Sequence, residues 1–393
     1  MEKPVVRLVT CGSVDDGKST LIGRVLVETN SVPGDIVEGA KLVRRSGSTV
    51  KTGEIDFSLL TDGLEAEREQ GITIDVAYRS MNLLNGRRLI LADAPGHEQY
   101  TRNMAVAASR ADIALVLVDA TRGIRTQTLR HLTVCSLMGV PRIYVVVNKL
   151  DGVAYSEKVF MGVREDLRET IARLEIDNVE FVPVSALLGD NVVYRTDKMP
   201  WYQGPTLLEC IQEWNVEEVG ANLPRLNVQI ISRSEGFRGV AGTVLGGSFT
   251  VGDEVAVLPS SKTAKIAKIS TFDGDLVSAL EGSAVTLLLE PEVDATRGDS
   301  VELARVATAA ADRFAATVVW LGDNALIHSK SYFLQSGSTQ VPAIVTSIRH
   351  VLNINNGEHE AARTLKTNEI GVLELATDAP INLTPYKAVS YTH

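Results

Sequence analysis

The segment from Gly12 to Ser19 constrains this 393-residue chain more than any other. It reads GSVDDGKS, which fits the pattern GxxxxGK followed by Ser or Thr, and it lies between the apolar run Val5 to Thr10 and the helical run Thr20 to Glu28. Glycines in such a loop let backbone N–H groups turn inward around phosphate oxygens, while Lys18 reaches the β and γ phosphates and the Ser19 hydroxyl binds Mg²⁺. The segment therefore predicts a nucleoside triphosphate site at a strand-to-helix turn.

Two later loops indicate which base is bound. Asn148-Lys149-Leu150-Asp151 follows the apolar strand Ile143 to Val147 and fits the pattern NKxD. An aspartate can accept hydrogen bonds from both the N1–H and the exocyclic N2 amine of guanine, a pattern that adenine does not offer. Ser185-Ala186-Leu187 follows the next strand, Phe181 to Val184, and is expected to present a backbone N–H to guanine O6. Guanine is therefore the predicted base.

The segment Asp93-Ala94-Pro95-Gly96-His97 fits the pattern DxxG and follows the strand Leu89 to Ala92. Asp93 can hold a Mg²⁺-bound water, and the Gly96 N–H can bond the γ-phosphate only while that phosphate is present. His97 comes directly after this glycine and is the predicted catalytic residue, which orients or polarises the attacking water. The other five histidines are expected to be structural or to lie at the surface.

A threonine is also well placed to act as a switch. Thr73 lies in the run Glu67 to Asp75 and is predicted to give its hydroxyl to Mg²⁺ and its backbone N–H to the γ-phosphate. Since phosphoryl transfer depends mainly on positioning and charge neutralisation, a missing group from a partner can leave the intrinsic rate about 10³ to 10⁵ lower. Partner-stimulated GTP hydrolysis is therefore expected.

Strand and helix patterns predict the domain organisation. Short β-branched runs alternate with helical patterns up to about residue 215, which is typical of an α/β domain with a mostly parallel sheet and helices on both faces. From Leu223 to Leu303 short strands are punctuated by glycines, which predicts a small β-barrel, and a second all-β stretch begins near Arg313. We therefore expect a GTP-binding domain over residues 1–217 and two small β-barrel domains over residues 218–305 and 306–393.

Composition limits the partners and the compartment. The formal net charge of -10 gives no general positive field for nucleic acid, so no nucleic-acid partner is expected. Three widely separated cysteines, Cys11, Cys135 and Cys210, favour a reduced, cytoplasmic setting. No run of 18 apolar residues occurs, so no membrane span is expected either.

With these motifs in place, the chain resembles the translation-factor class of GTPases, which includes elongation factor Tu. Gly12 to Leu21 matches GxVDxGKSTL, and Asp93 to Met104 matches DxPGHxxYxxNM. Within that class it is most similar to the GTPase subunit of bacterial ATP sulfurylase, sulfate adenylyltransferase subunit 1. The runs shared with that family are Val14 to Gly17, Asp62 to Leu64, Ala66 to Tyr78, Gly189 to Val193, Met199 to Tyr202, Thr271 to Asp275, Val318 to Leu321 and Ile354 to Asn356.

This resemblance implies a two-subunit reaction. A small catalytic subunit joins sulfate to ATP, giving adenosine 5′-phosphosulfate and pyrophosphate, and this chain couples GTP hydrolysis to that uphill step in a heterodimer or higher assembly. Asp16 stands where translation factors typically have histidine, and neither it nor Asp15 is assigned a catalytic role. The family's chain usually continues beyond a segment like Leu383 to Tyr386 into a final strand, so the third domain is expected either to lack that strand or to close differently.

Two other functions compete with this one. The first is a translation-type carrier that delivers an RNA ligand in its GTP state, and the second is an adaptor that binds GTP without hydrolysing it. Asp16 and the run Thr271 to Asp275 count against the carrier, and His97 counts against the adaptor. The residues expected to contact GTP are Gly12, Ser13, Val14, Asp15, Asp16, Gly17, Lys18, Ser19, Thr20, Asp93, Ala94, Pro95, Gly96, His97, Asn148, Lys149, Leu150, Asp151, Ser185, Ala186 and Leu187, and those expected to hold Mg²⁺ are Ser19, Thr73 and Asp93, the last through water.

Overall fold

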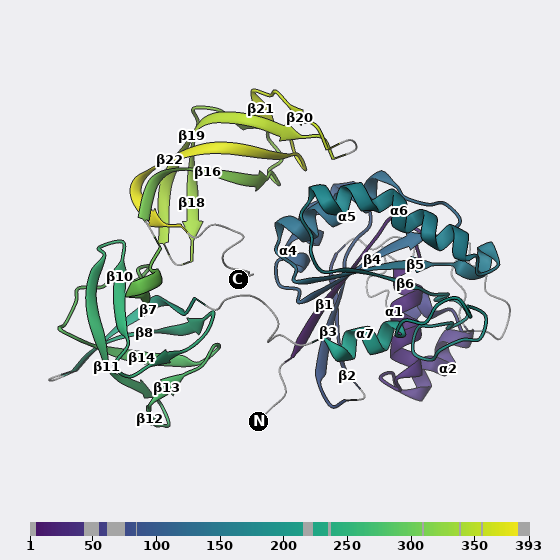
Figure 1. Ribbon diagram of the computed structural model, residues 1–393, viewed down its shortest axis with the longest axis horizontal. Helices are drawn as coiled ribbons and strands as arrows, with labels where there is room; N and C mark the ends of the chain where they lie inside the picture. The colour runs from purple at the N-terminus through teal and green to yellow at the C-terminus, as the bar shows by residue number, and fades with distance from the viewer. Residues whose placement is uncertain are drawn as a thin grey trace. The chain divides into compact units, whose positions relative to one another are not determined.

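The structure, a computed structural model, describes most of the chain (Figure 1). The described residues are 5–42, 55–60, 75–83, 85–214, 223–234, 237–308, 310–337, 339–354 and 357–383. The chain forms two compact units, one made largely of residues 1–218 and the other largely of residues 219–391. No helix in the described ranges is both long and apolar enough to cross a membrane.

A six-stranded sheet forms the centre of the first unit, with the order β2-β3-β1-β4-β5-β6. All neighbours are parallel except β2, which is antiparallel to β3 at the edge. The strands are β1 (Val6–Cys11), β2 (Ala77–Asn82), β3 (Arg88–Asp93), β4 (Ile113–Asp119), β5 (Arg142–Asn148) and β6 (Val179–Pro183). The predicted parallel strands are confirmed, while the edge strand β2 was not predicted.

Helices cover both faces of this sheet, with α4, α5 and α6 on one side and α1, α2 and α7 on the other (Figure 1). Every residue of β4 is consequently buried, which explains its apolar sequence from Ile113 to Val118 before Asp119. The helices are α1 (Lys18–Glu28), α2 (Gly34–Leu42), α4 (Thr101–Ala108), α5 (Thr126–Leu137), α6 (Glu157–Arg173) and α7 (Leu207–Glu213), with the short 3₁₀ segments η1 (Phe57–Leu60), η2 (Glu98–Tyr100) and η3 (Leu150–Val153).

The strand register brings the predicted site loops together. Thr10 at the end of β1 pairs with Asp93 at the end of β3, and Asp119 at the end of β4 pairs with Asn148 at the end of β5. Because parallel strands end at the same edge of a sheet, the loops that follow β1, β3, β4, β5 and β6 meet there.

A closed ring of six strands begins the second unit, with the order β10-β15-β7-β8-β14-β11 and a further pairing of β11 with β10. Inward side chains of this ring, such as Leu226 and Ile269, form one buried apolar core together with Phe249 of β9. The strands are β7 (Arg225–Ser234), β8 (Phe237–Leu245), β9 (Phe249–Thr250), β10 (Glu254–Leu258), β11 (Lys262–Thr271), β12 (Gly274–Leu276), β13 (Ser278–Ala279), β14 (Ala284–Glu290) and β15 (Ser300–Leu303). The predicted first barrel is thereby confirmed.

The rest of the second unit is also built of strands. After the 3₁₀ segment η5 (Ala304–Val306), the order β16-β22-β19-β18 forms an antiparallel sheet, with β20 paired to β19 and β17 paired to β21. The strands are β16 (Ala310–Val319), β17 (Leu326–Ile327), β18 (Ser331–Ser336), β19 (Thr339–Leu352), β20 (His359–Glu360), β21 (Thr364–Leu365) and β22 (Ile370–Asn382). Within the described ranges these strands form an open sheet and a separate ribbon, not a second closed ring. The predicted all-β character is confirmed. The expectation that the third domain lacks its final strand or closes differently stays a prediction, because residues 384–393 lie outside the described residues.

Candidate functional site

The loop between β1 and α1 is shaped by glycines at its two ends. Gly12 has φ +153° and Gly17 has φ +92°, and a Cβ at Gly17 would lie 2.4 Å from Asn148 Nδ2. The side chain of Lys18 is buried, and its Nζ donates to the carbonyls of Gly12 and Ser13, both at 2.9 Å. Burial lowers the pKa of Lys18, while the Asp93 and Asp16 carboxylates oppose that shift. The lysine therefore stands within the loop, where it can neutralise phosphate charge.

Asp16 has a structural role within the same loop. Its carboxylate is 1% exposed and accepts the Ser13 backbone N–H at 2.6 Å. Burial raises the pKa of Asp16, an effect that the nearby Lys18 ammonium partly offsets. The side chain thus closes the loop on itself. The Asp15 side chain, in contrast, is exposed. Its backbone carbonyl makes the contact within the site, because it accepts a hydrogen bond from Lys149.

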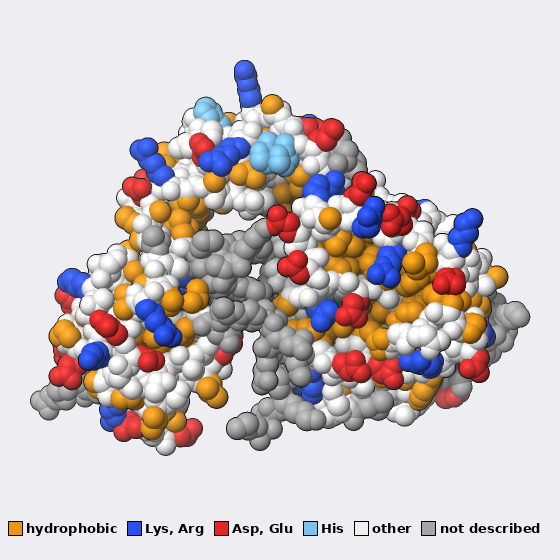
Figure 2. Space-filling view, viewed as in Figure 1, with side chains coloured by type: hydrophobic (Ala, Val, Ile, Leu, Met, Phe, Trp, Pro, Cys, Tyr) orange, Lys and Arg blue, Asp and Glu red, His pale blue; other side chains and the backbone are white. Residues whose placement is uncertain are grey.

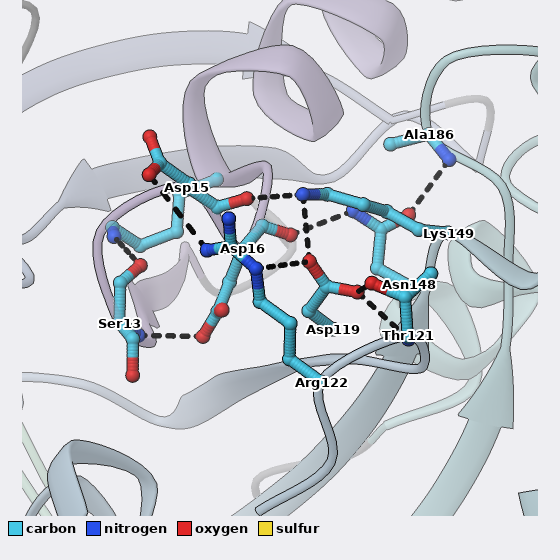
Figure 3. Close-up of polar contacts among 10 residues, drawn as sticks. Ser13, Asp15, Asp16, Asp119, Thr121, Arg122, Asn148, Lys149 and Ala186 are labelled. Carbon is cyan, nitrogen blue, oxygen red and sulfur yellow. Dashed lines mark hydrogen bonds and ion pairs between the residues drawn. The ribbon is translucent and has the colours of Figure 1, made fainter. Parts of the chain in front are cut away.

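Asn148 and Lys149 join this loop to the other site loops (Figure 3). Asn148 Nδ2 donates to the Asp16 carbonyl at 2.8 Å, and Asn148 Oδ1 accepts the Ala186 N–H at 2.9 Å. Lys149 Nζ donates to the Asp15 carbonyl at 2.5 Å and lies 2.8 Å from a carboxylate oxygen of Asp119. The predicted NKxD segment therefore holds the phosphate loop and the Ser185 to Leu187 loop in one arrangement.

Asp151, the last residue of that segment, has an unused acceptor. Its Oδ1 atom is buried and finds no hydrogen-bond partner in the described part of the chain. A buried carboxylate oxygen without a donor is costly, so such an atom indicates a ligand that supplies one. The predicted contact with the donor edge of guanine requires an acceptor of this kind.

Hydrogen bonds within the protein occupy two of the three backbone N–H groups of the Ser185 to Leu187 loop. The N–H of Ser185 donates to the Asp190 carbonyl at 3.0 Å, and that of Ala186 is taken by Asn148. This leaves the Leu187 N–H as the candidate donor to guanine O6.

Asp93 lies where oxygen ligands can gather. Its carboxylate is 3% exposed, accepts the Thr10 hydroxyl at 2.9 Å and lies 3.5 Å from Ser19 Oγ. A hydroxyl and a carboxylate are the oxygen donors that Mg²⁺ prefers, so Ser19 and Asp93 fit the expected metal site. Thr73, the third expected ligand, lies outside the described residues.

Gly96 and His97 follow on the same side of the phosphate loop. A Cβ at Gly96 would lie 2.5 Å from the Gly12 carbonyl and 2.7 Å from Lys18 Nζ, so only glycine fits there without movement. His97 is exposed, and its Nδ1 accepts the Gln99 N–H at 3.3 Å. Since Nδ1 acts as an acceptor, a neutral ring carries its proton on Nε2. The imidazole is thus free to turn an N–H toward a ligand beside Gly96.

Comparison with known proteins identifies the family of the chain. The family model described as Elongation factor Tu GTP binding domain matches residues 3–224, and the one described as GTP-eEF1A C-terminal domain-like matches residues 313–392. Sulfate adenylyltransferase subunit 1 of Aeromonas hydrophila subsp. hydrophila is 44% identical over 393 residues, which are 99% of this chain and 82% of that protein. The chain belongs to the sulfate adenylyltransferase subunit 1 family.

Longer relatives share the same region. The proteins named bifunctional enzyme NodQ from Rhizobium sp. (strain N33) and Azospirillum brasilense are 46% and 47% identical to this chain. The matches cover 97% and 99% of this chain but 59% and 63% of those proteins. The chain therefore spans about three fifths of the length of these NodQ relatives.

In this member of the family, two contributors to the site were not predicted from the sequence. Asp119, at the end of β4, accepts from both the N–H and the hydroxyl of Thr121, at 2.8 and 2.6 Å. Burial acts to raise the pKa of Asp119, but hydrogen bonds from Lys149 and Thr121 leave it below its ordinary value. Its place directly after a buried strand was the available signal. Arg24 on α1 donates to the carbonyls of Ala186 and Leu187, contacts that no local motif announces.

His131 on α5 is expected to make the free energy of unfolding of the first unit depend on pH. His131 is 3% exposed, and burial, together with the charges of Lys18 and Arg130, lowers its pKa to about 3. The unfolded chain binds the proton near pH 6.5 but the folded chain does not, so the free energy of unfolding falls as pH drops from about 6.5 toward 3. We expect His131 to contribute a loss of about 2 kcal/mol between pH 7.5 and pH 5.

Urea unfolding of the wild type and of His131→Gln at these two pH values measures this contribution. The variant is expected to lose less stability on acidification than the wild type, whereas His328→Gln, which changes an exposed histidine, is expected to follow the wild type. Identical pH dependence in wild type and His131→Gln would show that His131 is not the group responsible.

Proposed function

We propose that this chain is the GTPase subunit of a sulfate adenylyltransferase. It binds and hydrolyses GTP, and this hydrolysis drives the formation of adenosine 5′-phosphosulfate and pyrophosphate from ATP and sulfate on a small partner subunit. The observation that carries the GTP part is the buried Oδ1 of Asp151, which has no hydrogen-bond partner among the described residues. It lies in the same segment as Asn148 and Lys149, which bond the phosphate loop. The sulfate part follows from family membership, because relatives of that name match 99% of this chain.

Different residues at the site bind the phosphates, the base and the metal ion. Backbone N–H groups of the Gly12 to Ser19 loop and the ammonium of Lys18 bind the phosphates, and Asp151 with the Leu187 N–H recognises guanine. Ser19 and Asp93 would hold Mg²⁺, which when bound neutralises charge on the phosphate oxygens. In the GTP state the Gly96 N–H would bond the γ-phosphate, so loss of that phosphate releases the loop.

His97 acts on the attacking water. With its Nδ1 occupied by the Gln99 N–H, the neutral ring offers an N–H at Nε2 and no acceptor, so it orients and polarises the water without removing its proton. The proton passes instead to phosphate oxygen as the P–O bond to water forms and the bond to the GDP leaving group breaks. Catalysis therefore depends on positioning, as expected for phosphoryl transfer.

The charge distribution favours a protein partner over RNA. On the face shown in Figure 2, Lys and Arg side chains are interspersed with Asp and Glu and do not gather in one basic patch. The net charge of -10 adds no general attraction for phosphate backbones. All three cysteines are buried free thiols, in keeping with a proposed cytoplasmic location.

Reconstitution with a small adenylyltransferase subunit tests the proposal. GTP turnover by the purified pair is expected to rise about tenfold or more when sulfate and ATP are both added, because the partner supplies what the isolated site lacks. Absence of stimulation in a pair shown to be folded and associated would contradict the sulfate-linked function. Tight GTP-dependent binding of aminoacyl-tRNA would instead favour an elongation-factor-like carrier.

A further inference from the structure

The segment Gly189 to Tyr202 contributes no group to the phosphate loop, yet it contains two of the runs shared with the family. Its central residue is Asp190, whose side chain is 9% exposed. Oδ2 of Asp190 accepts the Tyr155 hydroxyl at 2.5 Å and Lys198 Nζ at 3.0 Å, and Oδ1 accepts the Thr196 hydroxyl at 2.9 Å. A buried carboxylate with three donors is a fully satisfied polar network, and such networks hold their members in one arrangement.

Tyr155 connects this network to the loop that carries Asp151. The 3₁₀ segment η3 is followed by two residues with left-handed backbone, Ala154 at φ +51° and Tyr155 at φ +54°. This conformation is unfavourable for residues that carry a Cβ, so surrounding contacts must maintain it. Tyr155 is held through its hydroxyl by Asp190 and through its carbonyl by the Trp201 indole N–H at 2.9 Å.

Asp190 also holds the second guanine loop. Its backbone carbonyl accepts the Ser185 N–H at 3.0 Å, and the Ser185 carbonyl accepts the Gly189 N–H at 2.8 Å. Asp190 therefore contacts both loops. Its side chain bonds Tyr155 next to the Asp151 loop, and its backbone bonds the Ser185 to Leu187 loop. These loops carry the two groups that would recognise opposite sides of the guanine base edge.

We infer that Asp190, Tyr155 and Lys198 form a positioning unit that sets guanine specificity by fixing Asp151 relative to the Leu187 N–H. This inference depends on the proposed binding of GTP. None of the three residues is placed in contact with the nucleotide, so they act through the loops. Lys198 supports the unit from the outside, since its side chain is 48% exposed while its Nζ lies 3.3 Å from the Tyr155 hydroxyl.

Tyr155→Phe tests the unit, because it removes one hydroxyl and leaves the ring. The probes are GDP and inosine diphosphate, which lacks the exocyclic amine that Asp151 would bind, and dissociation constants are measured by calorimetry on the full chain. We expect GDP to bind about five- to tenfold more weakly to the variant, and the preference for GDP over inosine diphosphate to fall about threefold or more. Lys198→Met, at a half-exposed side chain, is expected to change the preference in the same direction.

Tyr202→Phe is the matched control. Its hydroxyl donates to the Pro205 carbonyl at 3.0 Å in the same segment and reaches neither guanine loop, so its nucleotide preference should equal that of the wild type. If Tyr155→Phe and Lys198→Met keep the wild-type preference, or weaken both nucleotides equally, the positioning role is wrong. If the wild type itself does not prefer GDP, the proposed GTP function is contradicted, and the positioning role with it.

Discussion

Asp151→Asn is expected to lower the affinity for GTP by about 10² to 10⁴-fold and to make xanthosine triphosphate the preferred nucleotide. The aspartate offers two acceptor oxygens, and one of them, Oδ1, is buried without a partner in the described chain. Each hydrogen bond to a charged group contributes about 1.5–3 kcal/mol, so losing the match with both guanine donors costs about 3–6 kcal/mol. Asparagine instead presents an N–H, which suits the C2 carbonyl that xanthine has in place of the guanine amine.

Equilibrium dialysis with guanosine and xanthosine nucleotides measures this exchange. Asp166→Asn provides a charge-matched control, because Asp166 is an exposed aspartate on α6 and its loss should leave both affinities unchanged. If the Asp151→Asn variant still preferred GTP, Asp151 would not be the residue that recognises the base. Another acceptor would then have to bind the N–H donors of guanine.

Local sequence was sufficient where the contacts of a candidate site residue lie within a single loop. Strand, glycine loop and helix are adjacent in the chain from Val6 to Glu28, so local spacing was enough to place Lys18. The same held for Asp93, which ends β3, and for Gly96 in the loop that follows. Periodicity also identified the parallel strands, because strands buried on both faces are apolar throughout.

Contacts between distant segments could not be predicted in this way. Asn148 bonds Asp16 across 132 positions and Ala186 across 38, and the second bond occupies one of the N–H groups of the loop expected to face guanine. Arg24 was not predicted because an arginine on an amphipathic helix has no distinguishing local pattern. Tertiary packing determines which hydrogen-bond donors remain available to a ligand at a site. A sequence motif predicts only which loops come together there.

The second unit shows the same limit. Regularly spaced glycines predicted short strands, but closure of the first barrel depends on the pairing of β10 with β11 in addition to the chain of neighbours. The strands from β16 onward were also expected to form a small barrel, yet the described ones form an open sheet. Strand pairing order is not encoded in the spacing of turns, so the sequence did not distinguish a closed ring from an open sheet.

His97→Ala is expected to lower the rate of GTP hydrolysis by about 10² to 10⁴-fold while leaving GTP affinity nearly unchanged. The imidazole is exposed and contacts Gln99 and Tyr100, so its removal should not disturb the phosphate loop. If the ring acts as an N–H donor to the attacking water, an amide can replace part of that role. His97→Gln should then recover part of the lost rate, because its side chain also donates an N–H.

Single-turnover hydrolysis of bound GTP separates chemistry from binding and product release. His328→Ala is the control, since that exposed histidine lies in the second unit, and it should hydrolyse GTP at the wild-type rate. Recovery by glutamine would support a positioning role over proton abstraction, because glutamine cannot serve as a base. Equal rates for wild type and His97→Ala would instead remove His97 from the reaction and leave water positioning to the backbone around Gly96.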